Sequence, residues 1–226
     1  MQQLQHKKEF QIERIAFFSD AVFAIAITLL IIEIKVPEID HDSNRPYDLQ
    51  LIESLVNEIL QKFIGFIVSF YVIGLYWMVH HRLFNYIVHY NRRLMSINLT
   101  FLLSIVIMPF SSAFLSEYFI IRVHTPLAFY TLNICFTGFM SYRLWKVASD
   151  PKYHLSQGLE SKILLRYNTI RAFTIPSIFL LVFIVSFING SVAFFALPLL
   201  PFVSLFINKH FRKKFPELMK EHLAQE

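Results

Sequence analysis

The chain alternates between long apolar runs and short clusters of charged residues. A helix needs about 20 mostly apolar residues to cross the ~30 Å hydrocarbon layer, because each residue adds about 1.5 Å of length. Residues 15–32 form such a run, with Asp20 as the one charged side chain inside it. Residues 63–79, 94–116 and 125–142 contain no charged side chain. Each of these four runs therefore predicts one membrane-spanning helix.

The last apolar run, residues 172–208, is too long for a single crossing. The turn signal Asn189-Gly190-Ser191 divides it into two segments of spanning length. The sequence therefore predicts an all-α polytopic membrane protein with six transmembrane helices, built as a single domain of residues 1–226. The predicted spans are residues 15–36, 62–80, 94–119, 125–146, 170–188 and 191–208.

The distribution of basic residues predicts how the helices are oriented. The chain has 21 Lys and Arg residues. When the N-terminus is placed in the cytoplasm, only Lys35, Arg45, Lys62 and Arg122 fall outside, which leaves 17 inside. The positive-inside rule then favours an even number of spans with both termini in the cytoplasm. The net charge of +5 is thus a topology signal, and dispersal over four segments argues against a nucleic-acid partner.

The segment between the first two predicted spans is acidic. It carries seven acidic residues against three basic ones. Two interpretations stay open: a solvated loop, or a vestibule that attracts cations if these segments ring a pore mouth. The seven acidic residues are Glu33, Glu38, Asp40, Asp42, Asp48, Glu53 and Glu58.

The first predicted helix combines an intramembrane acid with an apolar stripe. An ionised side chain inside a span is costly and usually functional, although Ser19 and Asp20 also suit a helix N-terminus as caps. The apolar stripe consists of Ile25, Thr28, Leu29 and Ile32. At about 100° per residue, Ser19 and Asp20 point about 130° away from the middle of this stripe, in opposite directions. The stripe contacts lipid, another subunit or a pore, and spacing alone does not decide among these three.

Several kinds of chemistry are disfavoured. The single cysteine, Cys135, excludes an internal disulfide framework and a multi-cysteine zinc site. His80, His81 and His89 lack a nearby acidic or thiol ligand that would complete a metal site. The chain contains no Gly-x-Ser-x-Gly, His-Glu-x-x-His or phosphate-binding loop. The sequence therefore predicts no enzyme, no cofactor and no bound metal.

The first helix resembles that of the transmembrane protein 175 family of potassium channels, prokaryotic single-repeat type. The resemblance is carried by Arg14, then Phe18-Ser19-Asp20, then an Ala-Ile pair and a Thr-Leu-Leu triplet that follow on the same helix. Further similar positions are Trp77 to His81 with Phe84, then Asn98, and Pro109-Phe110. The first half of the chain is thus similar in motif, and the second half only in the number of predicted spans.

The resemblance implies a passive, potassium-permeable cation channel in which the first helices of all subunits line the pore. Ile25 would form a tight hydrophobic ring, Leu29 and Ile32 would continue the lining, and Thr28 would add a layer of hydroxyls. Such a ring gates by dewetting. In agreement with this, no two glycines lie two residues apart, so a Gly-Tyr-Gly filter is absent from the sequence.

The resemblance also implies partners and an anchor for the pore helix. One repeat per chain implies a homotetramer in the lipid bilayer of a cell membrane, permeated by K⁺ and in contact with monovalent cations. An alternative is a secondary or proton-coupled transporter that uses Asp20 and a histidine as a relay. Which histidine partners Asp20 is open. The residues expected to anchor the pore helix are Arg14, Phe18, Ser19, Asp20, Trp77, His80, His81 and Asn98.

Overall fold

The computed structural model describes residues 2–35, 49–118, 124–159, 161–188 and 199–223. These residues form helices and no strand, apart from one isolated bridge between Ile87 and Ser156. The prediction of an all-α chain is confirmed. The elements are α1 (Gln2–Ile32), α2 (Leu49–Asn85), α3 (Arg92–Glu117), α4 (His124–Ala148), the short 3₁₀ helix η1 (Pro151–Tyr153), α5 (Lys162–Ser186), α7 (Leu199–Lys214) and α8 (Pro216–Leu223).

Four helical segments are long and apolar enough to cross a membrane: Phe10–Ile32, Ile52–Asn85, Arg92–Glu117 and Lys162–Ser186. Helix α4 is also of spanning length, with 25 residues, but it is more polar. Part of the sixth predicted span, residues 191–198, lies outside the described residues. The count of six spans therefore stays a prediction.

Helices α1 and α2 begin well before the spans predicted for them. The apolar runs mark only the part of each helix that suits hydrocarbon, and a helix continues into polar sequence until a breaker ends it.

One consequence concerns the acidic segment. Glu53 and Glu58, expected in a loop, lie on the first turns of α2, which starts at Leu49. Residues 36–48, which hold four of the seven acids, lie outside the described residues.

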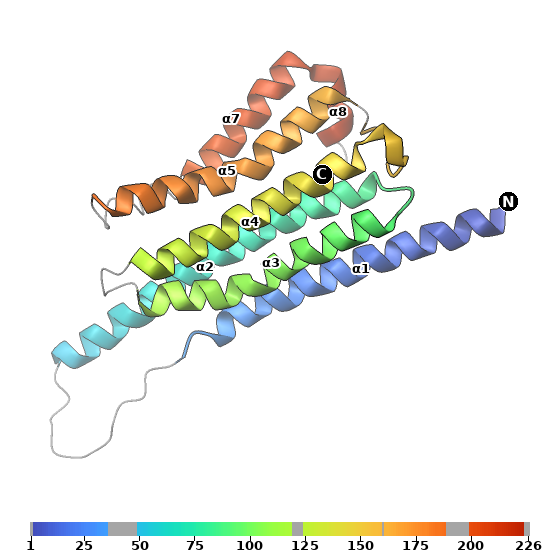
Figure 1. Ribbon diagram of the computed structural model, residues 1–226. Coiled ribbons are helices and arrows are strands. Elements are labelled where there is room, and N and C mark those ends of the chain that lie inside the picture. The colour runs from blue at the N-terminus through green and yellow to red at the C-terminus, as the bar shows by residue number, and fades with distance from the viewer. Residues whose placement is uncertain (1, 36–48, 119–123, 160, 189–198, 224–226) are drawn as a thin grey trace.

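The long helices run side by side in a layered bundle (Figure 1). Helix α3 lies in the middle and packs against α1, α2 and α4. Helix α4 packs in turn against α5, and α5 against α7. The bundle therefore has α1 on one side and the α5–α7 pair on the other.

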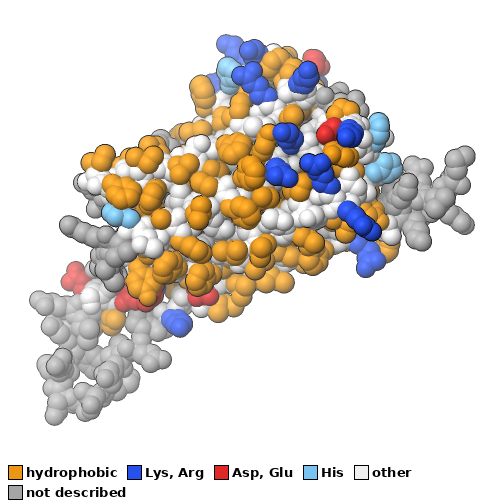
Figure 2. Space-filling view, viewed as in Figure 1, with side chains coloured by type: hydrophobic (Ala, Val, Ile, Leu, Met, Phe, Trp, Pro, Cys, Tyr) orange, Lys and Arg blue, Asp and Glu red, His pale blue; other side chains and the backbone are white. Residues whose placement is uncertain are grey.

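The two ends of the bundle differ in charge. The N-terminal end of α1, η1 and α8 lie at one end, and the start of α2 lies at the other (Figure 1). Figure 2 shows most of the Lys and Arg side chains toward the first end and a group of acidic side chains at the second. Which of the two ends faces the cytoplasm stays a prediction from the positive-inside rule.

Local sequence signals explain how the central helices meet. The Asn91 side chain caps α3 by accepting a hydrogen bond from the Leu94 backbone N–H at 2.8 Å. A Cβ atom at Gly138 would lie 2.7 Å from the Ala172 carbonyl oxygen, so only glycine permits this approach of α4 to α5. These contacts fix the start of α3 and the close packing of α4 on α5.

Candidate functional site

Helix α1 presents two faces of opposite character. Phe23, Ala26 and Leu30 are buried against the bundle. On the other face Ile25 is 59% exposed and Ile32 67% exposed. Burying such side chains is favourable by about 25 cal/mol per Å² of apolar surface. A single subunit thus leaves a continuous apolar face without a protein partner among the described residues.

The residues predicted to line a pore all lie on this exposed face. Leu29 and Thr28 are exposed beside Ile25 and Ile32. The Thr28 hydroxyl donates to the Ile25 carbonyl oxygen at 2.9 Å. Because its hydrogen is used in that bond, the oxygen lone pairs of Thr28 stay directed away from the helix backbone.

Ser19, Asn98 and His80 form a buried hydrogen-bonded chain between α1, α3 and α2. Asn98 Nδ2 donates to Ser19 Oγ at 3.0 Å, and Ser19 donates to the Ile15 carbonyl oxygen at 2.9 Å. His80 Nε2 lies 2.8 Å from Asn98 Oδ1 and donates to it, because an amide oxygen only accepts. Ser19, Asn98 and His80 are 0%, 2% and 3% exposed. The chain therefore joins three helices where water is excluded.

Asp20 makes a separate and more exposed contact with α2. Trp77 Nε1 donates to Asp20 Oδ1 at 2.9 Å. His81 Nδ1 lies 4.0 Å from Asp20 Oδ2, with about half of the histidine side chain exposed. The histidine beside Asp20 is therefore His81, while His80 belongs to the buried chain.

Aromatic rings enclose His80. Its ring stacks on Phe84 at 4.5 Å between centroids and on Phe101 at 5.4 Å. Phe23 of α1 lies 5.5 Å away in a tilted arrangement. Phe84 is among the positions that resemble the family, whereas Phe101 is not predicted from the sequence. The signal was present, because Phe101 follows Asn98 by three residues and so shares its helix face.

For two residues expected in the anchor, the anchoring role stays a prediction. Arg14 and Phe18 are exposed, Phe18 at 53%, and neither joins the hydrogen-bonded groups of the described residues. The reason is helical spacing: Phe18 precedes Ile25 by seven residues and Arg14 precedes it by eleven. Both intervals return to nearly the same side of a helix. Arg14 and Phe18 therefore extend the exposed face rather than the anchored one.

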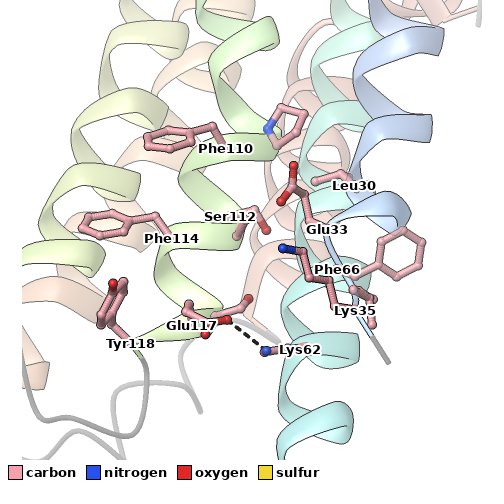
Figure 3. Close-up of a pocket in the computed structure, with 14 residues that line it drawn as sticks. Leu30, Glu33, Lys35, Lys62, Phe66, Phe110, Ser112, Phe114, Glu117 and Tyr118 are labelled. Carbon is pink, nitrogen blue, oxygen red and sulfur yellow. Dashed lines mark ion pairs between the residues drawn. The ribbon is translucent and has the colours of Figure 1, made fainter. Parts of the chain in front are cut away.

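A cavity of about 310 Å³ lies at the acidic end, between the end of α1, α2 and α3 (Figure 3). Lys62 bridges two helices here, with Nζ 2.8 Å from Glu58 on α2 and 2.9 Å from Glu117 on α3. Glu33 and Lys35 come from the end of α1. Lys62 thus offsets part of the acidic charge predicted for this end, and it ties α3 to α2 beside the end of α1.

Comparisons with known proteins agree on one group of membrane proteins. A family model described as the endosomal/lysosomal potassium channel TMEM175 matches residues 14–109. A potassium channel of Chamaesiphon minutus is 31% identical over 177 residues, covering 78% of this chain and 84% of the relative. A potassium channel of Streptomyces collinus is 40% identical over 105 residues, which cover 46% of this chain and 48% of that relative.

A solved structure extends this similarity to the fold. The crystal structure of a lysosomal potassium-selective channel TMEM175 homolog from Chamaesiphon minutus superimposes with a TM-score of 0.67 at 28% sequence identity. The match covers 88% of this chain and 98% of that chain. The similarity therefore includes helices after α3, where the sequence motifs end.

Proposed function

The chain belongs to the family of the endosomal/lysosomal potassium channel TMEM175, and from this premise we propose that it is a potassium-permeable cation channel narrowed by a ring of Ile25 side chains. The observation that carries the proposal is the division of α1 into an anchored face and an exposed apolar face. Potassium is proposed as the permeant ion because similar proteins are named as potassium channels. A ring of isoleucines expels water and blocks ions until it widens.

The pore requires several copies of the chain. Four subunits arranged about one axis place their four exposed α1 faces opposite one another. The apolar faces then cover one another and together surround a single central pore. The single repeat supports a homotetramer. The basic end of the bundle supports a cytoplasmic location for both termini and insertion in a cell membrane.

Potassium flux into liposomes tests the proposal. Purified protein is reconstituted, and K⁺ uptake is compared with that of empty liposomes and of liposomes that contain the protein after heat denaturation. A channel gives currents that reverse at the potassium equilibrium potential and need no second ion. Flux that requires a proton gradient would instead support the alternative, a transporter in which Asp20 and His81 relay a proton. Uptake equal to that of empty liposomes contradicts both.

Replacing Thr28 by valine is expected to weaken the preference for potassium over sodium. Valine keeps the branched shape but removes the hydroxyl oxygen, so a partly dehydrated cation loses an oxygen partner beside the Ile25 ring. Reversal potentials in mixed solutions measure the change. Thr100→Val is the matched control, because Thr100 on α3 also donates to its own helix, at 2.9 Å from the Ser96 carbonyl oxygen. If neither variant shifts the reversal potential, selectivity does not depend on Thr28.

Replacing Asp20 by alanine is expected to reduce assembly more than selectivity. The substitution removes the acceptor of the Trp77 indole, a bond at the edge of the protein with an expected cost of about 1 kcal/mol. The yield of assembled protein in size-exclusion chromatography measures this effect. Asp20→Asn keeps an acceptor oxygen and should recover most of the yield. A variant that assembles normally but loses its potassium preference would place Asp20 in the permeation path.

A further inference from the structure

Arg171 is a charged residue inside the predicted fifth span, on the side of the bundle opposite α1. It lies about two and a half turns from the start of α5, which begins at Lys162. Arg171 is the second residue of the span predicted for 170–188, so it lies at the edge of the span, where an arginine is tolerated when its head group reaches a polar partner or the interface. If α1 lines the pore, as proposed above, α5 and α7 form the outer layer that faces lipid. At this position the Arg171 guanidinium is therefore expected to contact a polar or anionic group.

The guanidinium is held toward the basic end of the bundle. Arg171 Nη1 donates to the Tyr167 hydroxyl at 2.9 Å, one turn back along α5, and lies 5.5 Å from the ring centroid. The Tyr167 hydroxyl donates to Asn208 Oδ1 of α7 at 2.8 Å. Since Tyr167 is fully buried, this bond fixes α7 beside the guanidinium. The charge is thus built into the contact between α5 and α7 and is not free on the surface.

A small crevice opens beside Arg171. It holds about 40 Å³ and is lined by Ser141, Thr174 and Ser204 together with apolar residues of α2, α5 and α7. Its size admits one small polar group and no acyl chain. The Thr174 hydroxyl donates to the Ile170 carbonyl oxygen at 2.8 Å, so the guanidinium is the charged donor at this crevice, and phosphate oxygens accept from such a group.

The surroundings of the crevice are strongly basic. The described residues from Arg143 to Leu223 include eleven Lys and Arg and three Asp and Glu. Arg166 on α5 and Lys209 on α7 are exposed, and each lies next to a residue of the Tyr167–Asn208 contact. In Figure 2 most of the Lys and Arg side chains lie toward one end of the face shown. Toward the other end of the bundle the surface of α7 is apolar, with Leu205 and Phe206 exposed.

We propose that an anionic phospholipid of the phosphatidylglycerol class binds at the basic end of α5 and α7, with its phosphate at Arg171. Basic pockets between helices at this side of a membrane are suited to such head groups, and attraction falls off within a Debye length. The acyl chains lie along the exposed apolar surface of α7. A zwitterionic lipid lacks the net charge that this surface attracts.

The test is a titration of the purified, intact protein in detergent with short-chain phosphatidylglycerol, followed by its melting temperature. Phosphatidylglycerol is expected to raise the melting temperature, and neither phosphatidylcholine nor inorganic phosphate is expected to do so. Arg171→Gln should weaken the apparent affinity about fivefold. Because the assay reads lipid binding and not ion flux, failure here leaves the proposed channel function standing, and absence of flux leaves this site standing.

Two further variants keep the test decisive. The double variant Arg166→Gln with Lys209→Gln changes exposed residues only, and it should also weaken binding if Arg171→Gln fails to fold. Arg92→Gln, at the same end but on α3, is the matched control and should bind as the unaltered protein does. Equal shifts with both lipids, a shift with inorganic phosphate alone, or equal weakening by Arg92→Gln would each overturn the site.

Discussion

Potassium conductance is expected to rise when Ile25 is replaced by asparagine. Ile25 stands in the middle of the exposed face of α1, and its side chain is 59% exposed in the subunit. In the proposed tetramer four such side chains meet, and a narrow apolar ring excludes water. Asparagine is smaller than isoleucine and hydrates readily, so water and ions enter the constriction at lower cost. A barrier lowered by about 1.4 kcal/mol would correspond to a tenfold increase in current.

Single-channel recording in planar bilayers measures this change directly. The matched control is Ile31→Asn, the same substitution on the same helix. Ile31 is also exposed, at 47%, but lies about 110° from the middle of the Ile25 face. Its conductance should stay near that of the unaltered protein. Unchanged or lower current in assembled Ile25→Asn protein would remove Ile25 from the constriction.

Replacing Asn98 by alanine is expected to destabilise the subunit more than any change at Asp20. Asn98 supplies both the donor to Ser19 and the acceptor for His80, and all three side chains are buried. Its removal leaves two polar groups without their partner, at about 1–3 kcal/mol each. Interhelical hydrogen bonds in membrane proteins average about 0.6 kcal/mol in double-mutant cycles, because their partners often find substitutes. Here aromatic rings surround His80, so substitutes are scarce.

The melting temperature of the purified protein measures the loss, and size-exclusion chromatography shows whether the subunits still assemble. Leu99→Ala is the control, since Leu99 is the next residue on α3 and is 55% exposed. It should melt close to the unaltered protein. If Asn98→Ala melts no lower than Asp20→Ala, the buried chain does not contribute more than the Asp20–Trp77 contact.

The apolar pattern predicted the two faces of α1 but not the partners of each side chain. Spacing placed Ser19 and Asp20 on opposite sides of the Ile25 face, and the structure has Ser19 against α3 and Asp20 against α2. Which histidine contacts Asn98 and which lies beside Asp20 depends on the rotation of α2 about its axis. His80 and His81 point about 100° apart, and neither carries a local signal for that rotation.

Residues with charged heads were harder to place from sequence. Arg171 is basic and lies at the edge of the span predicted for residues 170–188, yet it belongs to α5, which begins nine residues earlier at Lys162. A long side chain lets its charge reach an interface that its backbone does not, so charge alone marks a span boundary poorly. Lys62 shows the same limit, because its pairing with Glu117 on α3 required the register of two helices.

The attachment of α1 has a consequence for how a pore of this kind opens. Ile12, Ser19, Phe23, Ala26 and Leu30 are all buried, so α1 is held by its neighbours along most of its length. Turning it about its own axis would break bonds to two different helices at once. If Ile25 forms the proposed constriction, widening there would therefore carry α2 and α3 along as one rigid body. The work of opening would then be set by the contacts between subunits and with lipid, and a stimulus acting on the periphery would reach the constriction without any signal along α1 itself.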